Sequence, residues 1–160
     1  MIVIMIISIV TGTAAVMLTD SSDQRFKNEA KRLQQVLVFA TDEASYRNRI
    51  LGFYSLNNGY EILTFSPNSQ EWESSMEKKF AHYQLPETIS LEIEVENQHV
   101  DSTERGSIGK EDAGKEPQLF ILPDGEISPF IITMSSLDKR LATIQSDSLS
   151  KVSIEFSYEN

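Results

Sequence analysis

The sequence has no cysteine among its 160 residues and only two histidines, His82 and His99. Disulfide bonds, thiolate nucleophiles and cysteine-ligated metals are therefore excluded, although this absence decides nothing about the redox compartment. The histidines do not form a metal-ligand spacing such as H-E-x-x-H. There is also no G-x-S-x-G elbow, no Walker A loop and no G-x-G-x-x-G turn. Together these absences predict a protein that is not an enzyme and that has no catalytic residue, metal or cofactor.

Positive charge is also scarce. The chain has 14 basic and 24 acidic residues, a formal net charge of −10 and a pI of about 4.6. Such a chain lacks the basic surface that binds nucleic acid, so no nucleic-acid partner is predicted. Anionic lipid would repel it, and any membrane association must therefore come from burial of apolar side chains. No motif indicates a small-molecule substrate.

The first eighteen residues, from Met1 to Leu18, carry no charge at all. Three interpretations fit this stretch: a transmembrane anchor, a cleaved signal peptide, or a buried core helix. A helix of this length would span about 27 Å, close to the hydrocarbon thickness of a bilayer. A signal peptide would begin with a basic region, which is missing, and would give way to a mature N-terminus instead of more helix. We therefore favour the anchor and predict that residues 1–20 are the transmembrane or filament-core part of one long helix. The side chains expected to pack there are Ile2, Ile4, Ile6, Ile7, Val10, Val16 and Leu18.

Residues 21–50 continue this helix in amphipathic form. Apolar residues recur at alternating spacings of four and three, which is the period of a helix with one buried face. We interpret this stripe as the surface that covers the domain's own sheet; contact with another helix in a polymer is the lesser alternative. Gly52 is predicted to end the helix. The stripe consists of Phe26, Ala30, Leu33, Leu37, Ala40 and Ala44.

The remainder of the chain has the patterns of antiparallel strands. Residues 53–56 and 60–65 flank the connection Asn57–Gly59 and predict a hairpin. Residues 89–95 alternate strictly between apolar and polar, and residues 140–144 and 152–158 could form a last pair. Residues 119–122 and 126–134 predict another hairpin, in which Pro129 requires an edge position or a bulge. The predicted fold class is α+β, with a long N-terminal helix packed on an antiparallel sheet.

Three further segments have alternative interpretations. Trp72, the only tryptophan, is expected to pack against the helix, with a partner contact as the alternative. The segment after it, residues 73–83, is at most weakly helical. The carboxylates of residues 92, 94 and 96 are expected to be solvated, because no other segment supplies converging metal ligands. Residues 101–116 predict a hydrophilic loop, and a calcium site there is the lesser alternative.

Two stretches carry a resemblance to a known family. The stretch Pro117–Phe130 (PQLFILPDGEISPF) consists of an apolar strand, a Pro-x-Gly-Glu turn and a Ser-Pro-Phe return. The stretch Asn28–Asn48 is a predicted helix with Glu-Ala and Arg-Leu pairs. Together with the uncharged N-terminal helix, these features resemble the type IV pilin-like proteins, and among them the H-type minor pseudopilins of the type II secretion system (GspH). The family-like positions are Pro123, Gly125, Glu126, Pro129 and Phe130.

The resemblance implies a structural role. It implies a single-pass protein of the bacterial inner membrane, with residues 21–160 forming a periplasmic head. The implied partners are other minor and major pseudopilins, the inner-membrane secretion platform and the lipid bilayer. The subunit would join the pseudopilus near its tip and support the export of folded proteins across the outer membrane. Family members begin with a basic leader, a Gly-Phe junction and a glutamate inside the mature helix, and they are N-methylated. Because none of these motifs is present, we expect that the chain is truncated or that its start is miscalled.

Two alternatives share this architecture. A minor pilin of a type IV pilus or competence system would have the same helix and head. A membrane-tethered periplasmic binding or adaptor domain would use the helix only as an anchor. Genome neighbours would distinguish the first alternative, and replacement of the N-terminal segment would distinguish the second.

Overall fold

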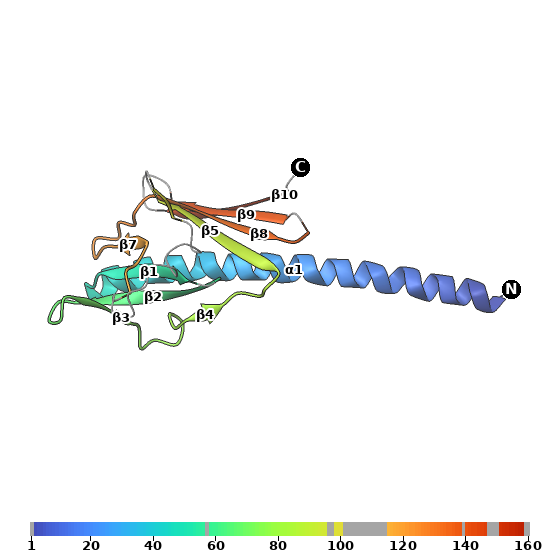
Figure 1. Ribbon diagram of the computed structural model, residues 1–160, viewed down its shortest axis with the longest axis horizontal. Helices are drawn as coiled ribbons and strands as arrows, with labels where there is room; N and C mark the ends of the chain where they lie inside the picture. Colours follow the sequence, from blue (N-terminus) through green and yellow to red (C-terminus); the bar gives the residue numbers. More distant parts are fainter. Residues whose placement is uncertain are drawn as a thin grey trace, which may run out of the picture.

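The structure is a computed structural model. It describes the chain except for residues 1, 57, 96–97, 101–114, 139, 147–150 and 159–160, and it leaves the side chains of residues 2–21, 56 and 98–100 undescribed. One helix, α1 (Ile2–Arg47), is followed by β1 (Leu51–Leu56), β2 (Gly59–Ser66), β3 (Glu71–Ser74), β4 (Tyr83–Gln84), β5 (Ile89–Val95), β6 (Gln98–Val100), β7 (Leu119–Ile121), β8 (Phe130–Ser136), β9 (Arg140–Ser146) and β10 (Val152–Tyr158). Figure 1 shows α1 as a rod whose rear half lies within a head of strands and whose front half projects from it. The predicted α+β fold is confirmed.

The helix is continuous over 46 residues, which corresponds to a rod of about 70 Å. It ends at Arg47, three residues before the predicted limit of 50. Asn48 adopts a left-handed conformation with φ of 51°, and the amide of Arg49 donates to the carbonyl of Ala44 at 3.0 Å. This is the Schellman type of C-terminal cap, in which asparagine replaces the usual glycine. The prediction that Gly52 ends the helix was therefore wrong, because Gly52 lies inside β1.

Two antiparallel sheets form the head. The first has the order β3-β2-β1-β7, with β4 also paired to β2, and the second has the order β10-β9-β8-β5-β6. The predicted pairing of β1 with β2 and of β9 with β10 is confirmed. The first hairpin is tighter than predicted, because Leu56 pairs directly with Gly59 and Gly59 thus belongs to β2. Asn58, with φ of 57°, supplies the left-handed residue of this turn.

The second predicted hairpin is confirmed beside its turn, but it is wrong for the rest of its return strand. Strand β7 pairs with β1 in the first sheet, whereas β8 pairs with β5 and β9 in the second. Residues 126–128, before β8, run antiparallel to β7. The amide of Leu122 donates to the carbonyl of Glu126 at 2.8 Å, the amide of Ser128 donates to the carbonyl of Phe120 at 2.9 Å, and Ile121 bridges Ile127. Pro129 comes just before β8 and not inside a strand, where its missing N–H would interrupt a ladder. The chain therefore turns back along β7 as far as Ser128 and then crosses at Pro129 into the second sheet.

Trp72 does not pack against the helix as predicted. It lies on β3, and its ring contacts Phe65 of β2 and Phe120 of β7, with centroids 5.3 and 5.8 Å apart. The β2–β3 register pairs Trp72 with Phe65. Ile62 lies three residues before Phe65, so its side chain is on the other face of β2, and it is buried in the cluster that contains the helix stripe. Because side chains alternate across a strand, the tryptophan lies on the outer face of the first sheet. Residues 73–83, predicted to be at most weakly helical, run from the end of β3 to the first residue of β4. Between these strands the amide of Ala81 donates to the carbonyl of Glu77 at 3.1 Å, which closes a single turn.

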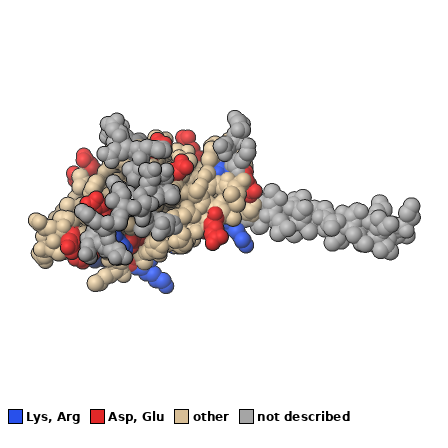
Figure 2. Space-filling model, viewed as in Figure 1, with Lys and Arg blue, Asp and Glu red and all other residues tan. Residues whose placement is uncertain are grey.

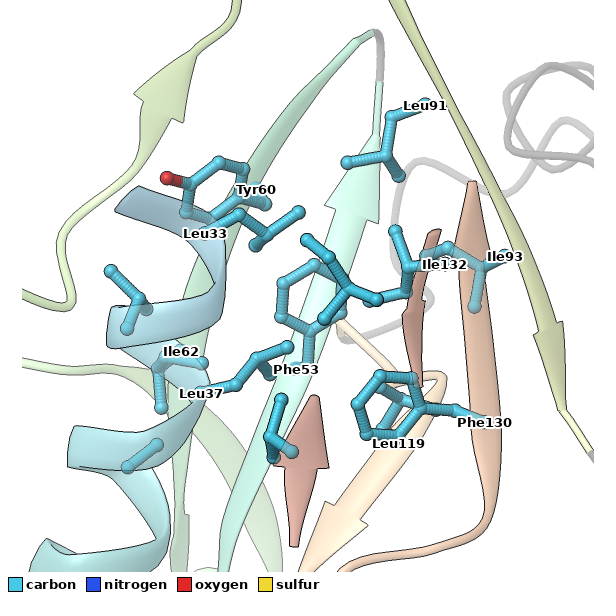
Figure 3. Packing of buried hydrophobic residues seen from close by; sticks show 14 of the residues in the cluster. Leu33, Leu37, Phe53, Tyr60, Ile62, Leu91, Ile93, Leu119, Phe130 and Ile132 are labelled. Carbon is cyan, nitrogen blue, oxygen red and sulfur yellow. The ribbon is translucent and has the colours of Figure 1, made fainter. Parts of the chain in front are cut away.

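The core lies between α1 and both sheets. Figure 3 shows Leu33 and Leu37 of α1 directed toward Phe53 of β1, with Ile132 of β8 close by. In β5 the predicted alternation is confirmed, since Ile89, Leu91 and Ile93 are buried while Ser90, Glu92 and Glu94 are exposed. Burial of the helix face against two separate sheets holds the rear half of the rod within the head.

Candidate assembly sites

The helix face predicted to pack on the sheet is covered by the head. Phe26 is 3% exposed, and the other five side chains of the stripe are 0% exposed. All six belong to one cluster that also contains residues of both sheets. Three of them are alanines, whose small side chains let the strands approach the helix closely. A neighbouring subunit therefore cannot reach this face while the head is folded. The six are Phe26, Ala30, Leu33, Leu37, Ala40 and Ala44.

The side chains predicted to pack in the membrane or filament core lie outside the described side chains, although the backbone that carries them belongs to α1. Searched over the part of the chain that the structure describes, α1 offers no stretch apolar and long enough to cross a membrane. The residues concerned are Ile2, Ile4, Ile6, Ile7, Val10, Val16 and Leu18.

The opposite face of α1 carries exposed apolar side chains. Val38 is 38% exposed, Phe39 is 51% exposed and Tyr46 is 88% exposed. Phe39 and Tyr46 are seven residues apart, so they lie on the same side of the helix. The ammonium of Lys79 lies 5.9 Å from the centroid of the Phe39 ring. This face is the part of α1 within the head that a second protein can contact.

A cluster of polar side chains fastens the head where α1 leaves it. The guanidinium of Arg140 makes an ion pair from Nε to Asp23 at 3.1 Å, and it donates from Nη2 to the hydroxyl of Ser22 at 3.1 Å. Its Nη1 also bonds Asp138 at 2.9 Å. The hydrogen bond from Lys27, 2.6 Å away, lowers the pKa of the Asp23 carboxyl, so Asp23 stays ionised. Sequence analysis missed this cluster, because no local pattern indicates a contact across 118 residues.

A second contact joins α1 to the first sheet. The hydroxyl of Tyr83 bonds both carboxylate oxygens of Glu29, at 3.0 and 2.9 Å, and the guanidinium of Arg32 lies 3.4 Å from the centroid of the Tyr83 ring. Tyr60 packs beside Tyr83, with centroids 5.5 Å apart, and is 2% exposed. Its hydroxyl makes no hydrogen bond in the described structure, and burial raises the pKa of Tyr60 to about 12.

The outer face of the first sheet contains a buried carboxylate. Glu61 of β2 is 3% exposed, and it accepts hydrogen bonds from Lys115 at 2.5 Å and from Ser74 at 3.1 Å. Beside it, Pro117 lies directly over Gly52, where an added Cβ would come within 2.5 Å of the proline ring. These contacts fix the chain that leads into β7 on this face.

The stretch with the family-like residues connects the two sheets near the end of α1. The amide of Gly125 donates to the carbonyl of Leu122 at 3.0 Å, which closes a turn with Pro123 at its second position. Gly125 has a φ of 89°, and a Cβ at this position would meet the hydroxyl of Ser45 at 3.3 Å. The exposed Glu126 donates its amide to Asp124, and Pro129 is exposed before β8. Phe130 is 3% exposed in the core. The stretch is thus a structural crossover rather than a polar site.

No metal site is found among the described residues. No group of three or more histidine, aspartate or glutamate side chains gathers closely enough among them to hold a metal ion. Glu92 and Glu94 are exposed on β5, while Glu96 and most of the predicted loop, residues 101–114, lie outside the described residues.

Comparison with known proteins gives a consistent set of relatives, although no family model matches the chain. Over 139 residues the chain is 31% identical to type II secretion system protein H of Pseudomonas aeruginosa, covering 84% of this chain and 78% of the relative. Over 160 residues it is 24% identical to type II secretion system protein H of Aeromonas hydrophila, covering 93% and 87%.

Two solved structures share the fold. The crystal structure of the minor pseudopilin EpsH from Vibrio cholerae matches with a TM-score of 0.66 and 18% identity, over 82% of this chain and 96% of that one. The solution structure of Escherichia coli GspH matches with a TM-score of 0.56 and 19% identity, over 86% and 90%. The identity to the Pseudomonas protein over most of both chains, on a fold shared with solved H-type pseudopilins, makes this chain a member of the type II secretion system protein H family of minor pseudopilins.

Proposed function

We propose that this minor pseudopilin is anchored in the bacterial inner membrane by residues 1–20, with residues 21–160 as a periplasmic head, and that it joins the pseudopilus near its tip. The observation that carries the proposal is the continuity of α1. The uncharged N-terminal stretch and the half enclosed by the head belong to one helix without a break. In this role the subunit supports export of folded proteins across the outer membrane as a building element.

The physical chemistry of the helix supports a transfer from membrane to filament. An uncharged apolar helix half is stable in lipid, and it is equally stable in a bundle of similar helices. Moving the subunit from the bilayer into a filament core therefore costs little free energy. The proposed bundle contacts come from the apolar side chains between Ile2 and Leu18.

The proposed partners are other minor and major pseudopilins, the inner-membrane secretion platform and the lipid bilayer. The exposed face of α1 with Phe39 and Tyr46 supports a contact with a neighbouring head, because two aromatic side chains project there from a rigid helix. The helix face on the other side is occupied by the protein's own core. Contacts between heads would therefore use the outward face.

Replacement of residues 1–20 tests the proposal. One variant receives an unrelated single-pass anchor of the same length, and a control variant receives the corresponding helix half of another pseudopilin. Secretion is measured as the fraction of exported protein in the culture medium. We expect the unrelated anchor to abolish function and the pseudopilin helix to retain it. If the unrelated anchor supports normal secretion, the segment is only a tether, and the protein is an adaptor domain instead of a filament subunit.

A further inference from the structure

Three large apolar side chains are exposed at one end of the head. Leu137 is 81% exposed, Tyr158 is 67% exposed and Phe156 is 40% exposed. Leu137 lies in the turn between β8 and β9, and the other two are near the end of β10. Figure 1 shows this turn and the end of β10 at the end of the head from which α1 emerges. We call Leu137, Phe156 and Tyr158 the rim.

The rim lies level with a defined point on the helix. Tyr158 pairs with Arg140 in the β9–β10 ladder, and Leu137 is three residues before Arg140. Arg140 in turn donates to the hydroxyl of Ser22 and makes an ion pair with Asp23. Leu137 and Tyr158 therefore lie near the height of residues 22–23 of α1, and Phe156, which pairs with Ala142, lies two residues further into the head.

That height can be compared with the dimensions of a bilayer. Ser22 lies four residues after Leu18, the last apolar residue before the first charge at Asp20, which is a rise of about 6 Å along a helix. The headgroup layer extends roughly 5–7 Å beyond the hydrocarbon on each side. If residues 1–18 occupy the hydrocarbon, the rim lies in the headgroup layer. This step rests on the membrane anchoring proposed above.

The chemistry of the rim suits this layer. Along β10 the alternating apolar positions begin with the buried Val152 and become progressively more exposed toward Tyr158. A tyrosine ring with a polar hydroxyl is favoured where apolar and aqueous phases meet. The charged groups around the rim have both signs, because Lys27 and Arg140 lie beside Asp23 and Asp138. In Figure 2 basic and acidic side chains are likewise seen together where the rod leaves the head.

We propose that the rim is a membrane-interface contact that holds the base of the head against the headgroup layer while the subunit awaits assembly. The contact is apolar rather than electrostatic, since the chain has a net charge of −10 and the local charges are mixed. It gives the head a fixed orientation on the membrane, which a single flexible tether would not provide.

Single-cysteine labelling of the full chain tests the rim, and the absence of native cysteine makes each label unique. The variants Leu137→Cys and Tyr158→Cys carry an environment-sensitive NBD fluorophore in vesicles of phosphatidylethanolamine and phosphatidylglycerol. Met76→Cys, at a fully exposed position between β3 and β4, is the matched control. We expect the rim labels to shift to shorter emission wavelength and to lose emission when lipids carry nitroxides on their headgroups. The label at position 76 should show neither effect.

A fourth variant, Ser8→Cys, separates this inference from the proposed anchoring. Quenching of its label by nitroxides on the acyl chains, combined with rim labels that behave like the control, would overturn the rim contact while anchoring stands. Failure of the Ser8 label to be quenched would overturn both. Rim labels that are protected only after other pseudopilins are added would identify a protein contact and contradict the proposal. Equal quenching in vesicles of phosphatidylcholine alone would support an apolar contact, whereas a need for anionic lipid would refute it.

Discussion

Leu37→Ala is expected to destabilise the head strongly, because Leu37 is 0% exposed between the helix and the strands. Truncation removes three carbon atoms, which costs about 2.4 kcal/mol at about 0.8 kcal/mol per buried methylene. Two sheets enclose the site and limit its collapse, so the remaining cavity adds about 1 kcal/mol. The expected loss in the free energy of unfolding is therefore about 3–4 kcal/mol.

The matched control is Phe39→Ala, two residues away on the opposite face of the same helix. Phe39 is 51% exposed, so its truncation should change the free energy of unfolding by less than about 1 kcal/mol. Urea unfolding of the full chain in detergent micelles, followed by the emission of Trp72, gives both values. Equal losses for the two variants, or a loss below about 1 kcal/mol for Leu37→Ala, would contradict the helix orientation described here.

Three other predictions concern the first sheet. Gly52→Ala should lower the free energy of unfolding in urea by about 1–3 kcal/mol, because its Cβ would meet the rigid ring of Pro117 at 2.5 Å. A variant of unchanged stability would mean that Pro117 can move away. Lys115→Met should lower the free energy of unfolding by about 2–3 kcal/mol, since it leaves the buried Glu61 carboxylate without its cation. Adding Glu61→Gln should restore most of this stability. A double variant no more stable than the single one would refute the pairing. Burial raises the pKa of Tyr60 to about 12, so between pH 10 and 12 the unfolded chain releases a proton that the folded chain keeps, and stability should fall by about 2–3 kcal/mol as pH rises through this window. The same pH titration of Tyr60→Phe should lack this component, and identical pH profiles for the two proteins would contradict the assignment.

Local patterns were sufficient to predict the main elements. The absence of charge from residues 1–18 and the alternating spacing of four and three from Phe26 to Ala44 describe one helix with a buried face. Strict alternation predicted β5 and β10, because a strand with one covered face needs apolar side chains at every second residue. These features depend on neighbours in sequence, which is why they can be recognised without the structure.

Features that depend on distant partners could not be predicted. Between Leu119 and Met134 only Pro129 interrupts the predicted hairpin, and a proline does not show whether the chain bulges or crosses to another sheet. Trp72 was assigned to the wrong face, since β3 was not recognised and its register with β2 decides where the ring points. Asn48 ends the helix four residues before the more obvious Gly52, because asparagine also tolerates the left-handed conformation.

The enclosure of α1 by two sheets that share no strand ladder in the described structure has a mechanical consequence. A pull along the axis of the rod would load both sheets in shear at the same time, so many side-chain contacts would have to slip together before the helix could slide out. A force across the rod would instead pry the sheets apart one contact after another. A head built in this way resists force along its own helix better than sideways bending.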